Sequence, residues 1–435
     1  MPSPLVARHP IAADRQTNPA VDAWFDFDLL QLLALLGAFA LVVLWARRRF
    51  AVPERDGAMP RRAPRWLGPL AGAAVVFAVH QVLTVVSSDG FLLATLLGPA
   101  VLLAIAVRFF RWNRKNARPV GLGRLVFGNL LVLAIPLGLL LAFGELWFRC
   151  VRDTTDSVGY TKVALRWLER HYRYNNFGFR DNVDYQLAKT PDRRRVTFVG
   201  DSFTAGHGIA DVDRRCANLL RHEHPEWEVH VIAQNGFNTS EEIARFADAP
   251  RLGYALQEVV LVYCLNDAMD LLTEWNTTLK LAEERAKAGR LPVFDSSWLL
   301  DTIYFKVAIS SIPGVGDYFA FIGEAYRGTI FAQQAERLRT LRRTVEAGGG
   351  RLYVVTWPFV HALGKDYPHR EIHERLAAFW RDEGVPHLDL LPHLIDQDPA
   401  TLVVNSSDAH PNERGNRLAA DVIGPWLVQQ FARPR

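Results

Sequence analysis

Four long apolar segments in the first 150 residues restrict the fold of this chain more than any other feature. They lie at about 29–46, 66–86, 91–107 and 125–148, and very few charged residues interrupt them. Each is close to the roughly 20 residues that an α-helix needs to cross a lipid bilayer. The first segment follows an acidic leader and lacks a small-residue cleavage site, unlike a secretory signal peptide. The sequence therefore predicts a membrane region with four transmembrane helices in residues 1–150.

Basic residues are concentrated in two of the loops between these segments. Seven arginines lie between the first and second segments, and six Lys or Arg residues lie from the end of the third to the start of the fourth. The turn at Ser87–Gly90, between the second and third segments, has none. By the positive-inside rule, both basic loops face the cytoplasm. We therefore expect residues 151–435 on the opposite, extracytoplasmic side.

The net charge is divided unevenly along the chain. Residues 1–150 contain 16 Lys and Arg against 8 Asp and Glu, whereas the remaining residues contain 34 against 38. The overall charge of +4 therefore comes from the membrane region and not from the soluble part. A nucleic-acid-binding domain needs a basic face, so we expect no nucleic acid as a partner.

Neither a metal nor a cofactor is predicted. The three cysteines, Cys150, Cys216 and Cys264, have no metal-ligand spacing and are too few for a disulfide framework, although one pair could form a disulfide in an oxidising compartment. No glycine-rich phosphate-binding loop is present in the sequence. We expect buried thiols.

From residue 193 onward, short β-rich runs alternate with amphipathic helical patterns. Predicted strands lie at 196–199, 228–233, 258–263, 351–356 and 387–390. Predicted helices lie at about 214–222, 240–248, 269–289, 331–347, 369–383 and 412–431. This alternation is typical of a parallel sheet with helices on both faces, in which ligands bind at the carboxyl ends of the strands. The sequence therefore predicts an α/β domain at 193–435.

Two segments fall outside this alternation. Residues 151–192 follow the membrane region and are predicted as a linker. An aromatic-rich insertion at about 291–330 is too long for a simple connection. The insertion could be a lid over the active site, a surface that rests on the membrane, or a helical addition that only packs against the domain.

The stretch RVTFVGDSFTAGHG, Arg195–Gly208, contains the first candidate for a reactive side chain. The predicted strand ends at Gly200, where the chain can turn without steric penalty. The turn places the hydroxyl of Ser202 at an edge of the sheet, as nucleophilic catalysis requires. The same pattern also occurs as an ordinary turn in which serine caps a helix, so a nucleophile needs further support from the chain.

Among thirteen histidines, His410 has the context of a general base. It stands just before the final predicted helix, with Pro411 in the first turn. Asp408, two residues earlier, could orient the imidazole and stabilise the imidazolium, as the acid of a triad does. A histidine near a helix start is otherwise often a packing residue.

Two other strand ends offer hydrogen-bond donors for an oxyanion. Gly236, in QNGFNTSEE, lets a backbone N–H approach a substrate closely, and Asn266, in LNDAMD, could donate its side-chain amide. A helix-capping turn and an Asx-turn would also explain these two motifs.

Four further side chains stand near these motifs. Asp201 is expected to tie the serine turn through hydrogen bonds. His207 either lines the site or lies on the following helix. Trp357 either stacks on a sugar ring or packs in the core, and His361 follows the same strand toward the same edge of the sheet.

The order of the motifs resembles the SGNH, or GDSL-type, hydrolase superfamily. The resemblance covers about residues 193–435 and implies a flavodoxin-like three-layer α/β/α sandwich. It implies that Ser202 is the nucleophile and His410 the base. It also implies that Gly236 and Asn266 join the Ser202 backbone N–H in an oxyanion hole. The segment Asn175–Asp181, NNFGFRD, resembles one that precedes the Gly-Asp-Ser block in many membrane-attached bacterial members.

Two positions depart from the pattern of the superfamily. Its third block usually reads Gly-x-Asn-Asp, and here Cys264 replaces the glycine. Its last block usually reads Asp-x-x-His, but Ser407 stands three residues before His410 and the nearest acid is Asp408. If Asp408 does not reach the imidazole, the site is a Ser-His dyad oriented by a backbone carbonyl.

The sequence and the resemblance together predict a membrane-anchored esterase that hydrolyses or transfers O-linked acyl groups through a Ser202 acyl-enzyme. The expected substrate is an acylated surface or secreted glycan, although lipid esters occur at the same place. The rival hypothesis is a catalytically idle SGNH-like scaffold or binding module in a polysaccharide modification or export complex, which the altered acid position favours.

The expected location is a bacterial inner membrane, with the catalytic domain on the periplasmic side. The lipid bilayer is then a partner of the predicted spans. Within these spans only His80 and Glu145 are candidates for polar groups that a carrier of acyl donors would need. An anchor, or a docking surface for another membrane protein, is therefore the expected role of the helices.

Overall fold

The described part of the chain consists of two compact units. The computed structural model describes residues 88–115, 122–249, 252–287 and 292–433. The sheet unit contains Thr154–Lys287 and the chain from Ala308 onward, and the helical unit contains the described residues up to Asp153 together with 292–307. The first two predicted transmembrane helices, at about 29–46 and 66–86, lie outside the described residues.

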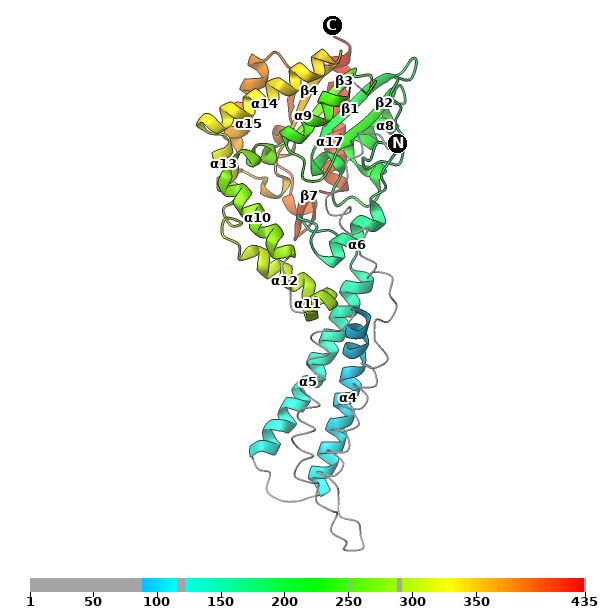
Figure 1. Ribbon diagram of the computed structural model, residues 1–435, viewed down its shortest axis with the longest axis vertical. Helices are drawn as coiled ribbons and strands as arrows, with labels where there is room; N and C mark the ends of the chain where they lie inside the picture. The colour runs from blue at the N-terminus through cyan, green and yellow to red at the C-terminus, as the bar shows by residue number, and fades with distance from the viewer. Residues whose placement is uncertain (1–87, 116–121, 250–251, 288–291, 434–435) are drawn as a thin grey trace. The chain divides into compact units, whose positions relative to one another are not determined.

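A five-stranded parallel sheet forms the centre of the sheet unit (Figure 1). Its strands are β1 (Arg194–Gly200), β2 (Trp227–Ala233), β3 (Glu258–Cys264), β4 (Arg351–Trp357) and β5 (His387–Asp389). They pair in the order β2-β1-β3-β4-β5, and each pair is parallel. This is the flavodoxin-like order of a doubly wound α/β fold. The predicted parallel α/β architecture is therefore confirmed.

Helices cover both faces of this sheet. Helix α8 (Cys216–Glu223) contacts α17 (Glu413–Phe431), whereas α9 (Thr239–Asp248) contacts α14 (Gly328–Ala347). Right-handed crossovers place α8 and α9 on opposite faces, because the chain moves from β1 to β2 in one direction and from β2 to β3 in the other. All seven residues of β2 and β3 are buried, as expected for strands covered on both faces.

The helix predicted at 269–289 begins differently from the expectation. Directly after β3 the chain forms a 3₁₀ helix, η4 (Leu265–Leu271), and α10 (Thr273–Lys287) follows. The side chain of Asp267 accepts a hydrogen bond from the backbone N–H of Cys264 at 3.0 Å. This contact holds the turn that carries Asn266 close to the end of the strand.

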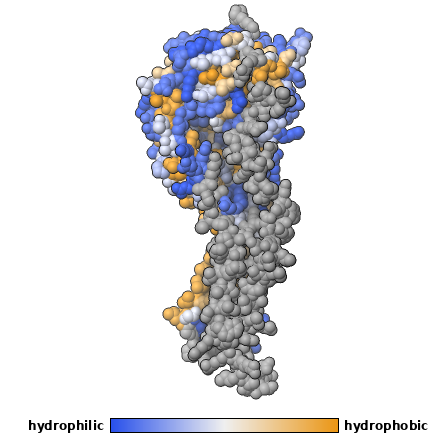
Figure 2. Space-filling view, in the orientation of Figure 1, coloured by the Kyte–Doolittle hydropathy of each residue, from blue (hydrophilic) through white to orange (hydrophobic). Residues whose placement is uncertain are grey.

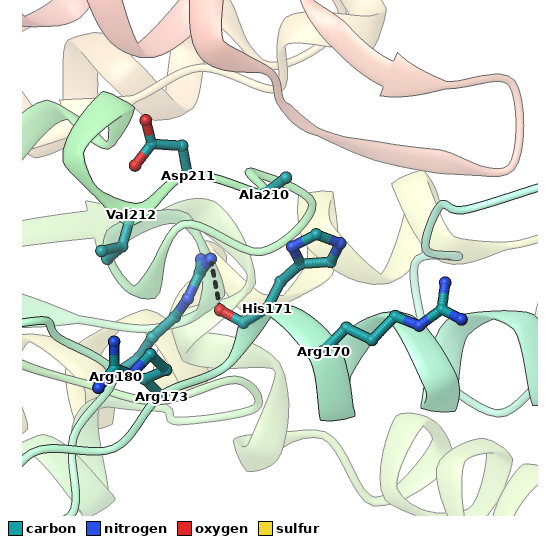
Figure 3. Close-up of a pocket in the computed structure, with 7 residues that line it drawn as sticks. All are labelled: Arg170, His171, Arg173, Arg180, Ala210, Asp211 and Val212. Carbon is teal, nitrogen blue, oxygen red and sulfur yellow. Dashed lines mark hydrogen bonds between the residues drawn. The ribbon is translucent and has the colours of Figure 1, made fainter.

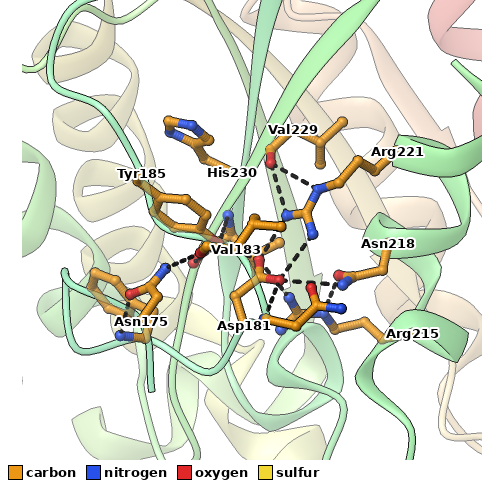
Figure 4. A network of polar contacts seen from close by, with 12 residues as sticks. Asn175, Asp181, Val183, Tyr185, Arg215, Asn218, Arg221, Val229 and His230 are labelled. Atoms are coloured by element: carbon orange, nitrogen blue, oxygen red, sulfur yellow. Dashed lines mark hydrogen bonds and ion pairs between the residues drawn. The ribbon is translucent and has the colours of Figure 1, made fainter. Parts of the chain in front are cut away.

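The predicted linker at 151–192 is largely packed into the sheet unit. It contains helix α6 (Lys162–His171) and the NNFGFRD segment, whose Asp181 lies at the centre of a buried polar network (Figure 4). Arg221 donates to both carboxylate oxygens of Asp181, at 2.9 and 2.6 Å, and Arg215 donates at 3.1 Å. Burial raises the pKa of Asp181, but the hydrogen bonds from Arg221 and the charge of Arg215 outweigh it and hold the pKa well below its usual range.

The aromatic-rich insertion is helical and is divided between the two units. It forms α11 (Pro292–Ser296), α12 (Trp298–Ser310) and α13 (Tyr318–Ala325) before α14 begins at Gly328. Residues up to Val307 belong to the helical unit and those from Ala308 belong to the sheet unit. In the sheet unit α13 contacts η4, at the carboxyl end of β3.

The helical unit contains two long apolar helices, α4 (Ser88–Lys115) and α5 (Leu122–Leu146), followed by the π-helical turn η2 (Trp147–Val151). Gly90–Lys115 and Leu122–Val151 are long and apolar enough to cross a membrane, by length and composition only. The visible surface of α5 is hydrophobic in Figure 2, whereas much of the visible sheet unit is hydrophilic. The helix predicted at 91–107 continues to Lys115, so residues 108–115 of the expected basic loop are helical.

Glu145 is buried in the helical unit, where it caps a helix. Its carboxylate accepts hydrogen bonds from the Ser297 hydroxyl at 2.7 Å and from the backbone N–H groups of Trp298 and Leu299 at 3.0 and 3.2 Å. The first amides of α12 have no partner within the helix and attract negative charge. The carboxylate of Glu145 is therefore engaged in capping α12.

The cysteines are unpaired, but only two of them are buried. Cys216 and Cys264 lie inside the sheet unit, whereas Cys150 is exposed in the helical unit, contrary to the prediction of buried thiols. Burial raises the pKa of the Cys216 thiol to about 12 and that of the Cys264 thiol well above its usual value.

Candidate active site

Ser202 lies at the turn that follows the central strand β1. Asp201 caps the short helix α7 (Ser202–Ala205) by accepting a hydrogen bond from the Phe203 backbone N–H at 2.9 Å. A Cβ atom at Gly200 would lie only 2.3 Å from the Thr204 hydroxyl oxygen and 2.6 Å from the carbonyl oxygen of Val262. The close approach of β3 to this turn therefore requires glycine, and it fixes where the Ser202 side chain begins.

The structure brings Ser202, His410 and Asp408 together in one line of hydrogen bonds. The Ser202 hydroxyl lies 2.8 Å from Nε2 of His410, and Nδ1 of His410 lies 2.6 Å from Oδ1 of Asp408. With Nδ1–H donating to the carboxylate, Nε2 is free to accept the serine proton. The arrangement differs from the dyad alternative, in which a backbone carbonyl would orient His410.

His410 and Asp408 lie on a hairpin that the sequence analysis missed. Strands β6 (Val403–Asn405) and β7 (Asp408–Pro411) are antiparallel, and α17 begins only after Asn412. Residues i and i+2 of a strand point to the same face, so Asp408 and His410 project side by side. This explains why an acid two residues before the histidine can reach the imidazole.

Burial and hydrogen bonding set the charges of this group. Burial raises the pKa of Asp408, but hydrogen bonds from His207 and His410 outweigh it and keep the pKa well below its usual range. Burial and the charge of His207 lower the pKa of His410, against the attraction of Asp408. The resting state is therefore an ionised carboxylate beside a neutral imidazole, as a general base requires.

The two predicted oxyanion donors follow the strands on either side of β1. Gly236 lies in the turn after β2 with a φ of +80°, a conformation that favours glycine, and a Cβ there would meet nothing within 4 Å. Asn266 lies in η4, after β3. Because β2 and β3 flank β1, both turns lie at the carboxyl edge of the sheet with Ser202.

Asp201 contacts both the serine turn and Asn266. Burial raises the pKa of Asp201 to about 6, against hydrogen bonds from the Phe203 backbone N–H and the Asn266 side chain, which lower it. An asparagine amide has two N–H donors, so one can bond Asp201 while the other remains for a ligand. The expected structural role of Asp201 thus extends to holding Asn266.

The other candidate side chains have different positions. Trp357 is only 1% exposed and packs in the core, so it offers no face to a sugar. His361 lies in the 3₁₀ helix η5 (Val360–Ala362), which contacts β7, and its ring stacks on Phe319 of α13 with centroids 5.4 Å apart. Burial and the charge of His410 lower the pKa of His361. His361 and the 39% exposed Phe319 therefore form an aromatic wall close to His410.

His207 contacts Asp408, together with a residue that the sequence analysis missed. Nε2 of His207 lies 3.3 Å from Oδ2 of Asp408, and the Thr155 hydroxyl donates to the same oxygen. Thr155 comes from the predicted linker, 253 positions from Asp408 in the chain. No sequence motif marks Thr155, because only the folded chain brings it to the hairpin.

One group of described side chains has ligand atoms close enough together to hold a metal ion. The atoms of His207, Asp408 and His410 all lie within 4.8 Å of one another. The carboxylate of Asp408 and one nitrogen of each imidazole already pair with one another. We therefore assign His410 and Asp408 to the hydrogen-bonded line that begins at Ser202, and His207 to the contacts that hold Asp408.

A separate pocket of about 230 Å³ lies beside the loop that carries His207 (Figure 3). It is lined by Arg170, His171, Arg173, Arg180, Ala210, Asp211 and Val212. The buried Arg180 donates to the carbonyl oxygens of Ala205 at 3.2 Å and His171 at 3.4 Å. Arg180 therefore holds the end of α7 against the segment that follows α6.

Comparisons with known proteins identify the family of the chain. The model of the GDSL-like lipase/acylhydrolase family matches residues 198–418. No curated protein matches the chain.

Two solved structures of similar proteins each align with just over half of this chain. A lipolytic protein of the G-D-S-L family from Veillonella parvula is 15% identical over 55% of this chain and 100% of that chain, with a TM-score of 0.33. An extracellular lipase from Streptomyces rimosus is 14% identical over 54% of this chain and 99% of that chain, also with a TM-score of 0.33.

Proposed function

Because the chain belongs to the GDSL-like lipase/acylhydrolase family, we propose that it is a membrane-anchored serine esterase with Ser202 as its nucleophile. The observation that carries the proposal is the hydrogen-bonded line from Ser202 through His410 to Asp408, with distances of 2.8 and 2.6 Å. A serine hydroxyl is a weak nucleophile until an adjacent base accepts its proton. Here the base is neutral, in contact with the hydroxyl, and held by a carboxylate.

In the first half of the reaction, Oγ of Ser202 attacks the ester carbonyl carbon while Nε2 of His410 takes its proton. The negative charge that develops on the carbonyl oxygen is stabilised by the backbone N–H groups of Ser202 and Gly236 and by the Asn266 amide. Collapse of this intermediate breaks the bond to the alcohol, which leaves with the proton from His410. The acyl group remains on Ser202.

In the second half, His410 takes a proton from an acceptor hydroxyl, which attacks the acyl-enzyme. If the acceptor is water, the product is a free acid. If it is a sugar hydroxyl, the acyl group is transferred to the glycan. Asp408 stabilises the imidazolium in both halves. The same side chains therefore support hydrolysis and transfer, and water access to the acyl-enzyme decides between them.

We favour an O-acylated glycan at the cell surface as the substrate. The sheet unit follows two apolar helices, and the charge pattern of the sequence favours an extracytoplasmic position for it. The half-exposed ring of Phe319, stacked on His361, offers an apolar face and a polar edge near His410. A sugar ring with an ester substituent combines the same two chemistries.

The idle-scaffold hypothesis rests on the altered position of the acid. Asp408 contacts His410 in spite of that position, which supports the esterase proposal over the scaffold. An experiment on reactivity distinguishes the two hypotheses.

The first test is covalent labelling of the full chain in detergent with a fluorophosphonate probe. Wild-type protein should be labelled, and Ser202→Ala should not. Ser406→Ala, in the exposed turn of the hairpin, is the matched control and should label like the wild type. Folded wild-type protein that does not react would support the scaffold hypothesis. With labelling established, an acetyl ester supplied with and without a glycan acceptor distinguishes released acetate from acetylated glycan.

A further inference from the structure

The carboxylate of Asp408 receives more hydrogen bonds than His410 alone can give. Oδ1 accepts from Nδ1 of His410 at 2.6 Å and from the His410 backbone N–H at 3.1 Å. The side chain is only 1% exposed, so water cannot orient it freely. The other oxygen, Oδ2, faces away from His410 and needs partners of its own.

These partners come from two distant parts of the chain. The Thr155 hydroxyl donates to Oδ2, and Nε2 of His207 lies 3.3 Å from the same oxygen. Thr155 precedes α6, and His207 follows α7. The carboxylate is thus held at one oxygen by its own hairpin and at the other by two separate segments.

The tautomer of His207 is set by a further pair of side chains. The Asn235 amide nitrogen lies 2.8 Å from Nδ1 of His207, and the Tyr172 hydroxyl donates to the Asn235 oxygen at 3.0 Å. Tyr172 therefore turns the NH₂ group of Asn235 toward the imidazole, so Nδ1 accepts and Nε2 carries the proton. That N–H donates to the backbone oxygen of Asp156, 3.0 Å away, and also lies 3.3 Å from Oδ2 of Asp408.

The same segment also fastens the hairpin. The Asn405 amide donates to the Thr154 hydroxyl at 2.7 Å and to the Thr155 carbonyl at 3.0 Å, and the backbone N–H of Ser157 donates to the Ser407 carbonyl at 3.0 Å. These contacts tie 154–157 to both sides of the turn that precedes Asp408. Thr155 is therefore held in place independently of the carboxylate.

We propose that Thr155 and His207 are positioning residues that hold the Asp408 carboxylate toward His410. The hairpin strand that carries Asp408 and His410 holds only the Oδ1 atom of the carboxylate. Thr155 and His207 hold the other oxygen, Oδ2. The inference rests on the proposed function, because it assigns the two side chains a part in the general-base step. Neither residue contacts the reacting atoms, and both act through Asp408.

The test uses pairs of variants in the full-length protein. Thr155→Val and His207→Phe remove one donor each and keep the volume, whereas Thr155→Ser and His207→Gln keep a donor at nearly the same place. Each loss variant should lower kcat/KM about 10-fold through kcat, and the double variant about 100-fold, while the conservative variants stay within about threefold of wild type. Thr278→Val removes a buried hydroxyl on α10 and serves as the control for stability alone.

The pH profile separates positioning from a merely structural role. The titratable groups around His410 are Asp408, His207, Asp156 and His361. If Thr155 holds Asp408 toward His410, its loss should weaken the attraction of the carboxylate for the imidazolium and lower the pKa of His410 further. The acid limb of kcat/KM should therefore move to lower pH in Thr155→Val, but not in Thr278→Val. Variants that lose thermal stability with an unchanged acid limb would overturn the proposal.

One readout does not depend on activity. The proton between His410 and Asp408 should give a downfield imidazole resonance in proton NMR of the detergent-solubilised protein, and His410→Gln should abolish it. Thr155→Val/His207→Phe should shift or broaden this resonance, and an unchanged resonance would refute the positioning role. If the wild type neither reacts with the probe nor cleaves esters, the proposed function fails, and the resonance still decides whether Thr155 and His207 hold Asp408.

Discussion

Ser202 and His410 are held by two different kinds of structure. Ser202 follows the central strand of a five-stranded sheet, and its turn is fixed by close contacts with the neighbouring strand. His410 lies on a two-stranded hairpin outside that sheet, fastened by hydrogen bonds to residues near position 155. Ser202 is thus placed by core packing, and His410 and Asp408 by polar contacts between distant segments. Substitutions should therefore affect the two regions in different ways.

The largest expected effect is the loss of the base itself. His410→Ala should lower kcat for ester hydrolysis by roughly 10⁴-fold or more, because Ser202 then has no proton acceptor. Asp408→Asn should lower kcat less, by about 10²- to 10⁴-fold, since the imidazole remains but loses its carboxylate. Steady-state kinetics with a small chromogenic ester measure both. Equal activity of Asp408→Asn and wild type would favour a dyad without Asp408.

The turn after β1 should respond through stability. In Gly200→Ala the new Cβ would clash with the Val262 carbonyl and the Thr204 hydroxyl, at a cost of about 3 kcal/mol. Gly236→Ala is the matched variant, because a Cβ there has open space and only the positive φ costs about 1 kcal/mol. Thermal unfolding should therefore show the larger loss for Gly200→Ala. Similar losses would contradict the close approach of β3 to the serine turn.

The pH dependence tests the environment of the hairpin. His410 must be neutral to accept the serine proton, and burial together with the charge of His207 lowers its pKa below the ordinary 6.5. Activity should therefore persist below pH 6.5 and fall only when His410 becomes protonated. The acid limb of kcat/KM, measured from pH 4.5 to 8.5, checks this. His393→Gln, at an exposed histidine, should leave the limb unchanged, and a limb above pH 6.5 in the wild type would contradict the prediction.

The smallest effect is expected at the hairpin contacts. Asn405→Ala removes the hydrogen bonds to Thr154 and Thr155 but leaves the triad intact. If the loss of these hydrogen bonds raises the activation free energy by about 1 kcal/mol, kcat/KM should drop about fivefold. Ser406→Ala changes the neighbouring exposed residue and should have no effect. An unaffected Asn405→Ala would mean that the hairpin is rigid without these contacts.

The three residues of β5 are only half-buried, but strands β1 to β4 could be predicted from the sequence because nearly all of their residues are buried. Such strands read as continuous runs of β-branched and aromatic residues, as Val196–Val199 and Val259–Tyr263 do. The carboxyl ends of those strands then placed Ser202, Gly236 and Asn266 at one edge of the sheet. Elements with a strong local signal were therefore found to within one or two residues at most ends.

The hairpin and its supports could not be predicted in the same way. Strands β6 and β7 are only three and four residues long and carry polar residues such as Asn405 and Asp408, so they lack a periodic pattern. Thr155 reaches Asp408 across 253 positions, and no local motif encodes that contact. Asp408 stands two residues before His410, and not three as in the superfamily pattern. The reason why this spacing is sufficient became clear only when both residues were seen on strand β7.

The distribution of the three thiols offers a natural reporter for the proposed membrane anchor. Cys216 and Cys264 are buried with raised pKa values, which leaves Cys150 as the accessible sulfur, at the end of the apolar stretch Leu122–Val151. A membrane-impermeant maleimide added to sealed vesicles of known orientation would therefore react at a single position. The orientation of the vesicles that react then identifies the compartment in which Cys150 lies, without any engineered cysteine or fusion.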